Sequence, residues 1–211
     1  MHQERPDSRP STRRRAAAIA IAAIWLIIAG AGAIALLARE SRAADRGSTP
    51  STWPASTKLE HATDKPTLLM FMHPNCPCTR ASVTQLTRIL AAAPRGLQPK
   101  VIFVARPAAE HDWRVDWLTS MTRDVPGSTY VLDAKSAEAN RFGATTSGHV
   151  LLYSADGTLH FDGGVTLGRG HQGDNDAAES LSRALALPEN EPVETAVFGC
   201  AIEPRTHRSG P

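Results

Sequence analysis

Cysteine is scarce in this chain of 211 residues, which contains three. So few cysteines exclude a disulfide-dense scaffold and zinc modules that need four cysteine ligands. The sequence also shows no Ser, His and Asp set for nucleophilic catalysis and no H-E-x-x-H metal motif. Any cysteine chemistry therefore depends on very few thiols, and their positions in the chain become informative.

Positive charge is not concentrated in the part of the chain that could form a domain. The formal net charge is +2, with +3 on residues 1–15 and +1 on residues 39–46. These two segments flank an apolar run, and the other 165 residues carry a net charge of −2. Domains that bind nucleic acid concentrate basic residues on the binding surface. We therefore expect no nucleic-acid partner.

Residues 16–38 are 23 consecutive residues without a charged side chain. A helix of that length spans roughly 35 Å, enough to cross a hydrocarbon core of about 30 Å. Five Arg precede the run and three follow it, which favours a cytoplasmic N-terminus. The sequence predicts a basic cytoplasmic tail (1–15) and a single helix in the inner membrane lipid (16–38). The rest of the chain then faces the periplasm or the exterior.

A cleaved signal peptide is the alternative to this uncleaved anchor. An apolar core of 23 residues is long for a signal peptide. Small residues at 41–44 nevertheless offer a cleavage site. Both interpretations export the domain that follows.

Three segments follow the apolar run. Residues 39–58 are rich in Ser, Thr, Arg and Pro and predict a flexible linker. Residues 59–187 show sustained periodicity over the length of one compact domain. Residues 188–211 contain four Pro and few apolar side chains, which predicts an irregular tail.

Strands and helices alternate within the predicted domain. Apolar runs predict strands, and apolar residues at helical spacing predict helices. The Asp-Gly pair at 156–157 predicts the turn of a hairpin. The predicted strands cover 67–72, 101–105, 128–132, 150–153 and 159–161, and the predicted helices cover 77–93, 113–121, 137–142 and 177–187. This order predicts an α/β fold with a central sheet covered on both faces.

Two cysteines stand where the first strand meets the first long helix. Pro77 is favoured at the first helical position, which makes Cys76 the N-cap. The Cys76 sulfur would then face free N–H groups of Cys78 and Thr79, whose partial positive charge stabilises a thiolate. A protonated His73 would add to this effect. The sequence therefore predicts Cys76 as the nucleophile and Cys78 as the resolving thiol.

A disulfide between Cys76 and Cys78 would close a very small ring. Departure from relaxed geometry makes such a bond easier to reduce, and a short loop adds little stability. The pair is therefore expected to be redox-active. A local clip or two inert thiols are the alternative.

The arrangement of strand, cysteines and helix, followed by strand, helix, strand, hairpin and helix, resembles the thioredoxin-like superfamily, in its membrane-anchored extracytoplasmic branch. The chain is more closely similar to the RedB-type bacterial proteins. The resemblance implies a thioredoxin-like fold with a mixed sheet, and a thiol–disulfide oxidoreductase without a cofactor that acts on an extracytoplasmic protein partner. It rests on residues 69–82, 142–153 and 168–175.

Two departures from the thioredoxin pattern favour a different function. One residue separates the cysteines instead of two, and Gly148 and His149 stand where the family has a cis-proline that keeps metal off the thiols. Thiolates and imidazole select Cu(I). The alternative is therefore a copper-binding or copper-delivery protein with Cys76, Cys78 and His149 as ligands, or with His73 in place of His149.

Other candidates carry weaker signals. Cys200 would reach Cys76 as a third redox partner if the tail is unstructured, and a buried unpaired thiol is the alternative. His171 is a candidate site residue in a segment, 168–173, that matches G-x-G-x-x-G. The dinucleotide motif needs a further parallel strand and an acidic residue that are missing here, so we expect a turn with backbone N–H groups facing the site and no nucleotide.

The predicted topology is open to a direct test. Protease added to spheroplasts should digest residues 59–187, because both interpretations of the apolar run place this domain outside the cytoplasm. Immunoblotting against the domain measures the loss. A domain that survives until the spheroplasts are lysed would contradict the topology.

Overall fold

The chain forms two compact units, Met1–Glu40 and Ser41–Pro211. The computed structural model describes residues 12–73, 76–93, 100–105, 120–123, 125, 128–186 and 191–202. Each unit is described by itself below.

The first unit is a single long helix, α1 (Thr12–Glu40). Its most apolar window of 18 residues has a mean hydropathy of 2.5 and no buried residue. By length and composition the helix could span a membrane.

The second unit is built on one mixed sheet of six strands in the order β3-β2-β1-β4-β5-β6. Strands β1, β2 and β3 run parallel, β4 is antiparallel to both β1 and β5, and β6 is parallel to β5. Their bounds are β1 Thr67–Met72, β2 Lys100–Ala105, β3 Thr129–Leu132, β4 His149–Tyr153, β5 Leu159–Gly163 and β6 Val193–Glu194. All six residues of β1 are buried, which places this strand at the centre of the core.

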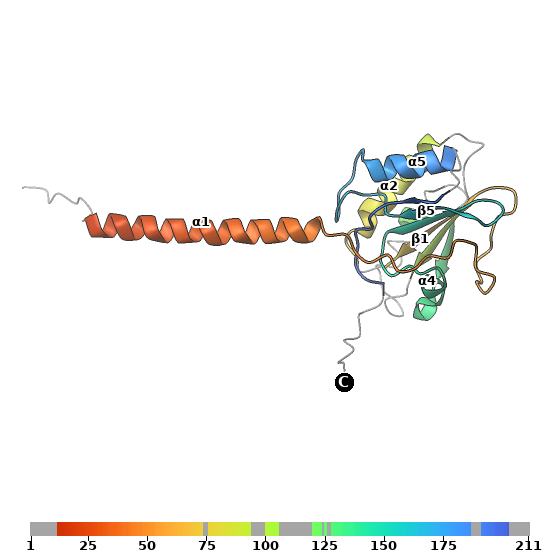
Figure 1. Ribbon diagram of the computed structural model, residues 1–211, viewed down its shortest axis with the longest axis horizontal. Coiled ribbons are helices and arrows are strands. Elements are labelled where there is room, and N and C mark those ends of the chain that lie inside the picture. Colours follow the sequence, from red (N-terminus) through yellow and green to blue (C-terminus); the bar gives the residue numbers. More distant parts are fainter. Residues whose placement is uncertain are drawn as a thin grey trace, which may run out of the picture. The chain divides into compact units, whose positions relative to one another are not determined.

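Helices cover both faces of this sheet (Figure 1). Helices α2 (Thr79–Ala92) and α5 (Asp176–Ala186) pack on one face, and α4 (Ala137–Arg141), which follows the short 3-10 turn η2 (Ala134–Ser136), packs on the other. Successive side chains of β4 alternate between the two cores: Val150 and Leu152 face α2, and Leu151 and Tyr153 face the α4 side. These features confirm the predicted α/β fold with a central mixed sheet covered on both faces.

Most predicted elements agree with the structure within one or two residues. Strand β1 has the predicted bounds, and the hairpin of β4 and β5 turns at the predicted Asp-Gly pair. The helix predicted over 113–121 lies largely outside the described residues, although 120–123 are helical. Strand β6 was not predicted, because a two-residue strand leaves no periodic signal.

The prediction of a flexible linker over 39–58 does not match the structure. Residues 39 and 40 belong to α1, and the segment from Ala44 to Thr57 is bonded to the domain. Trp53 is the anchor: its ring lies 5.0 Å from Phe142 and 5.3 Å from Tyr153, and its backbone bonds Gly157. The composition of residues 39–58 predicted a tether because it gives no sign of contacts with residues such as Phe142 and Tyr153, which lie about a hundred positions further along the chain.

The predicted irregular tail is ordered from residue 191 to residue 202. It contains β6 and two isolated bridges, from Val197 to Ala44 and from Ala201 to Thr146. Val197 and Ile202 are buried, at 0% and 3% exposed. These few apolar side chains dock the segment on the domain, which its Pro-rich composition did not reveal. Residues 188–190 and 203–211 lie outside the described part of the chain.

The docking of residues 44–57 predicts that Gly143→Ala will loosen this segment. A Cβ at Gly143 would lie 2.1 Å from the carbonyl oxygen of Ser48, so the two backbones must separate. The expected result is faster trypsin cleavage after Arg46, whose guanidinium is held by Asp162 and Glu194 in the native protein. Gel electrophoresis and mass spectrometry of the full chain in detergent measure the rate.

Gly170→Ala is the matched control for this substitution. Gly143 and Gly170 have similar positive φ angles, +67° and +73°, so alanine adds a similar backbone cost of roughly 1–2 kcal/mol at both. Nothing lies within 4 Å of a Cβ at Gly170. Equal cleavage rates in the two variants would contradict the docked segment.

Candidate active site

The two neighbouring cysteines lie in a tight turn between β1 and α2. The Cys76 N–H donates to the His73 carbonyl at 3.0 Å, and the Thr79 N–H donates to the Cys76 carbonyl at 3.1 Å. The N-cap of α2 is Cys78, with φ −72° and ψ −22°, and not Cys76 as the sequence predicted. The turn after Pro77 tightens before the α-helical hydrogen bonds begin, so the helix starts at Thr79, two residues later than expected.

The third cysteine reaches the same place from the C-terminal segment. The Cys200 backbone N–H donates to the Cys76 sulfur at 3.3 Å, although 124 residues separate the two in sequence. Cys76 is 1% exposed and Cys78 is 6% exposed, whereas Cys200 is half-buried. All three are free thiols in this structure. The described fold therefore gathers every cysteine of the chain.

Ser147, just before β4, connects the turn that carries Cys76 and Cys78 to the segment that carries Cys200. Its hydroxyl accepts a hydrogen bond from the His73 N–H and shares another with the Thr79 hydroxyl, both at 2.9 Å. Its own N–H donates to the Cys200 carbonyl at 2.9 Å. The neighbouring Gly199 approaches so closely that a Cβ there would lie 1.9 Å from the Ser147 carbonyl oxygen. Only glycine allows this contact without displacing backbone.

Gly148, which the sequence suggested as a supporting site residue, lies between the end of β1 and the first turns of α2. Its φ is +89°, and a Cβ would lie 2.9 Å from the Ser82 hydroxyl of α2. Its N–H donates to the Phe71 carbonyl of β1 at 2.8 Å. The residue thus lets the chain turn into β4 against the first turns of α2. In the described residues around this turn the peptide bonds are all trans.

Arg169 provides the positive charge of the site. Its guanidinium donates to the Gly199 carbonyl, and its positive charge offsets part of the rise in the pKa of Cys78. This side chain comes from the Gly-rich segment 168–173, for which the sequence predicted backbone N–H groups toward the site. The side chain of His171 in the same segment is exposed, and no described interaction joins it to the thiols. The arginine side chain, and not the glycine backbone, brings the segment to the cysteines.

The surroundings of Cys76 stabilise its thiolate. Burial by itself would raise the pKa of Cys76. Hydrogen bonding by the backbone and side chain of Cys200, and then by the Cys78 N–H and the Thr79 side chain, lowers this pKa by more than burial raises it. The net effect is a lowered pKa of the Cys76 thiol. The direction is the one that the sequence predicted, although Cys200 contributes more than the helix end does.

The other two thiols are kept protonated. Burial raises the pKa of Cys78, and the charge and hydrogen bond of Cys76 raise it further, while Arg169 offsets part of the shift. Burial and the same Cys76 contacts raise the pKa of Cys200 to about 12. The site thus combines one thiol whose pKa is lowered with two whose pKa values are raised.

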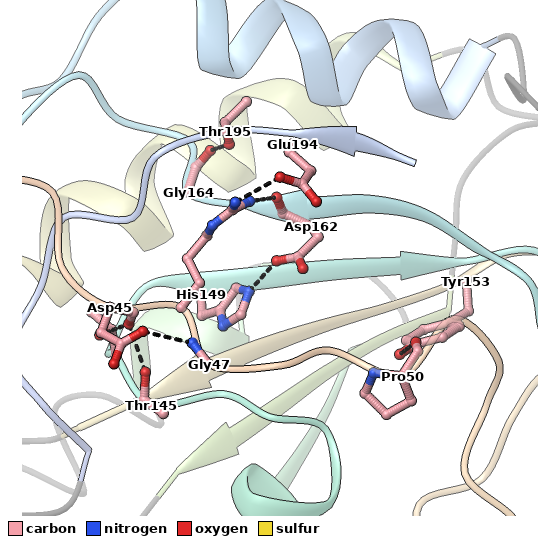
Figure 2. A network of polar contacts seen from close by, with 12 residues as sticks. Asp45, Gly47, Pro50, Thr145, His149, Tyr153, Asp162, Gly164, Glu194 and Thr195 are labelled. Carbon is pink, nitrogen blue, oxygen red and sulfur yellow. Dashed lines mark hydrogen bonds and ion pairs between the residues drawn. The ribbon is translucent and has the colours of Figure 1, made fainter. Parts of the chain in front are cut away.

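His149 lies in a different polar network, on the opposite face of the sheet (Figure 2). Its side chain alternates with Val150 and so shares the α4 side with Leu151. It is 0% exposed, and its Nε2 lies 2.5 Å from Asp162 Oδ1 of β5. Burial alone would raise the pKa of Asp162, but the bond and charge of His149 hold it below its usual range. His149 therefore lies near the docked segment around Asp45, on the face of the sheet opposite the one that α2 covers.

The copper ligand set that the sequence suggested is not gathered. Among the described residues, no group of three or more His, Cys, Asp or Glu side chains has the geometry to hold a metal ion. Cys76 and Cys78 are together, but His149 bonds Asp162 on the other side of β4. His73 contributes its backbone to the cysteine turn and is half-buried.

Three features of the site were missed from the sequence: the bridging role of Ser147, the charge of Arg169 and the docked position of Cys200. Ser147 and Arg169 stand in segments that the sequence analysis singled out, but no local pattern distinguishes them. Cys200 was considered, and its surroundings in Phe198-Gly199-Cys200 gave one usable signal: a glycine beside a cysteine allows close backbone approach.

Comparison with known proteins gives structural likeness only. No protein-family model matches the chain, and no curated protein matches it. A hypothetical protein from Sinorhizobium meliloti 1021 has a similar solved structure, with a TM-score of 0.54 and 15% identity over 77% of this chain and 96% of that one. An uncharacterized conserved protein from Geobacillus kaustophilus gives a TM-score of 0.54 and 16% identity, over 79% and 94% of the two chains. Both likenesses support the fold.

A more distant likeness is to a secreted Mycobacterium tuberculosis disulfide oxidoreductase described as homologous to E. coli DsbE. It has a TM-score of 0.41 and 22% identity, over 58% of this chain and 81% of that one.

The lowered pKa of Cys76 predicts the pH dependence of its alkylation. Because the thiolate is the reacting form, Cys76 should keep its reactivity toward iodoacetamide to a lower pH than Cys78 and Cys200 do. Peptide mass spectrometry at each pH gives a separate profile for each thiol. A Cys76 profile with its midpoint at or above about 8.5, the value of a free thiol, would contradict the assignment.

Thr79→Val tests the cause of this shift. The Thr79 side chain is one of the groups that lower the pKa of Cys76, so removing its hydroxyl should move the midpoint of the Cys76 profile to higher pH. Thr87→Val is the matched control on the same helix, because the Thr87 hydroxyl bonds the Val83 carbonyl and no cysteine. A profile shifted equally by both substitutions would point to a general effect on the helix.

Proposed function

We propose that this chain is a membrane-anchored, extracytoplasmic thiol–disulfide exchange protein whose reacting sulfur is Cys76. The observation that supports it most is the hydrogen bond that the Cys200 N–H donates to that buried sulfur at 3.3 Å. The polar groups of Cys200, Cys78 and Thr79 around the sulfur lower the pKa of Cys76 in spite of its burial. A structural cysteine of the core has no need for donors that stabilise its anionic form.

The proposed reaction needs a low-pKa nucleophile and a second thiol within reach. Thiolates attack a disulfide sulfur to form a mixed disulfide, and a second thiol then releases the partner. Cys78 and Cys200 both contact Cys76, and both stay protonated until they are used. Thiols carry the electrons themselves, so the proposal includes no cofactor.

The proposed location follows from α1 and the charge around it. A helix of 29 residues with an unbroken apolar stretch suits a single pass through an inner membrane. The Arg excess before the stretch suits a cytoplasmic N-terminus, with Ser41–Pro211 in the periplasm or the exterior. Disulfide chemistry belongs in such oxidising compartments. The proposed partner is therefore an extracytoplasmic protein with a thiol pair or a disulfide.

The resemblance to RedB-type proteins belongs to the same proposal. It rests on three segments, residues 69–82, 142–153 and 168–175. In the structure these segments contribute the cysteine turn, Ser147 and Arg169 to one site. Copper binding receives no such support, since its proposed ligands are not gathered.

A double variant, Cys78→Ser with Cys200→Ser, should trap the proposed intermediate. With both resolving candidates removed, a peptide disulfide incubated with the full chain should leave one peptide attached to Cys76. Intact-mass and fragment spectra locate and count the adduct. The remaining Cys76 keeps its backbone donors, because serine preserves the N–H groups at positions 78 and 200.

Cys76→Ser provides the matched control, since it retains the two other thiols. It should form at least about tenfold less adduct, because Cys78 and Cys200 are protonated at neutral pH. Absence of any adduct in the double variant would reject thiol–disulfide exchange at Cys76.

A further inference from the structure

Cys200 lies in a segment that is docked specifically beside Cys76. Residues 197–202 run antiparallel to residues 145–147: the Ser147 N–H donates to the Cys200 carbonyl at 2.9 Å, and the Ile202 N–H donates to the Thr145 carbonyl at 2.8 Å. We call residues 197–202 the C-terminal strap. Backbone pairing on both sides of Cys200 fixes where its side chain starts.

Side chains hold the strap at both ends as well. Val197, Phe198 and Ile202 are at most 9% exposed. The Arg169 guanidinium donates to the Gly199 carbonyl. The Cys200 N–H donates to the Cys76 sulfur at 3.3 Å, so the strap already holds the residue that carries the third thiol against the reacting sulfur. The strap therefore positions one particular thiol on another.

The strap also covers the reacting sulfur. Cys76 is 1% exposed, and the strap provides the N–H group that lies against it. An attacking or attacked sulfur needs an open approach. A partner disulfide can reach Cys76 only when the strap has moved away, and the return of the strap brings Cys200 back.

Cys78 is less well placed to close a disulfide with Cys76. The Thr79 N–H bonds the Cys76 carbonyl, and Cys78 has helical dihedral angles. On a helical turn, side chains two residues apart diverge by about 200°. A bond between these two sulfurs would require the turn to open. Cys200 belongs to a separate segment, so its sulfur approaches without that distortion.

We propose that Cys200, and not Cys78, forms the internal disulfide with Cys76, and that the C-terminal strap is the movable element that delivers it. This inference rests on the proposed thiol–disulfide exchange at Cys76. It changes the resolving residue that the sequence predicted, and it gives the third cysteine a role in the reaction.

A partner disulfide is reduced in two successive exchange steps. With the strap displaced, the Cys76 thiolate attacks one partner sulfur, the partner S–S bond breaks, and the other partner sulfur leaves as a thiolate. The strap returns, and the Cys200 thiol transfers its proton to that leaving thiolate or to solvent. Cys200 then attacks the Cys76 sulfur, the mixed disulfide breaks, and the second partner thiol leaves. Two electrons pass to the partner, and Cys76–Cys200 is the oxidised product; oxidation of a partner dithiol is the reverse.

Disulfide mapping of the oxidised full chain tests the pairing without any substrate. The chain in detergent is oxidised with diamide, free thiols are alkylated, and non-reducing peptide spectra identify the links. The expected product has Cys76 linked to Cys200 and Cys78 alkylated. A product with Cys76 linked to Cys78 and Cys200 alkylated would overturn the inference.

Release of a trapped peptide tests the pairing in the exchange itself. After a peptide disulfide has reacted with Cys76, the adduct should persist in Cys200→Ser and be released in Cys78→Ser, with rates at least about tenfold apart. The reverse order would overturn the inference while leaving exchange at Cys76 intact. Failure of the double variant to form any adduct would instead reject the proposed function, and the diamide map would still decide the pairing.

Gly199→Ala tests the strap as the delivering element, with all three thiols retained. A Cβ at this position would lie 1.9 Å from the Ser147 carbonyl oxygen and must push the strap away. The expected result is a several-fold smaller yield of the Cys76–Cys200 link after brief oxidation. A yield equal to that of the parent chain would overturn the proposed role of the strap.

Discussion

Ser147 is the point on which the geometry of the thiol site depends. Its hydroxyl holds the turn after β1 through the His73 N–H and holds the start of α2 through Thr79, and its backbone holds the C-terminal strap through Cys200. A small residue with a hydroxyl satisfies these contacts where a larger side chain would separate the segments. The close packing of Gly199 on its carbonyl depends on the same position. One residue thus sets the spacing between the cysteine turn and the strap.

The electrostatics of the site follow from that spacing. Cys76 is almost completely buried, which alone would disfavour its thiolate. Donors from the turn and from the strap reverse this effect. Burial, and then the interaction with Cys76, raise the pKa values of Cys78 and Cys200. The low pKa of Cys76 is therefore a property of the closed site. Displacement of the strap would remove its largest donors and admit a partner in the same movement.

Two segments outside the predicted domain complete the described fold. Residues 44–57 cover the α4 side of the sheet through Trp53 and Arg46, and the strap covers the thiols at the end of β1. The buried pair of His149 and Asp162 lies beneath the first of these segments, where Arg46 donates to the Asp162 carbonyl. His149 thus belongs to the network around Asp162, and Cys76 acquires a neighbour, Cys200, from the C-terminal segment.

The sequence by itself determined the local features of this protein. The apolar run of α1, the strand and helix periods of residues 67–186, the Asp-Gly turn and the two cysteines at the start of α2 are all signals between residues close in sequence. Such signals predicted the α/β fold and placed Cys76 next to a helix end. Even there the turn was tighter than expected, because the hydrogen bond from Thr79 to Cys76 shifts the helix start.

Only the tertiary structure decided which distant residues meet. The partners of Trp53, Arg46 and Cys76 lie about 90 to 150 residues away, at Phe142, Glu194 and Cys200. Composition made the segments that carry Trp53 and Cys200 look like a linker and a tail, because a few anchoring side chains and backbone bridges leave no periodic pattern. The face of β4 on which His149 lies was likewise settled by the pairing of the strands. Contacts of this kind depend on the closure of long loops around a common core, and local sequence does not contain that information.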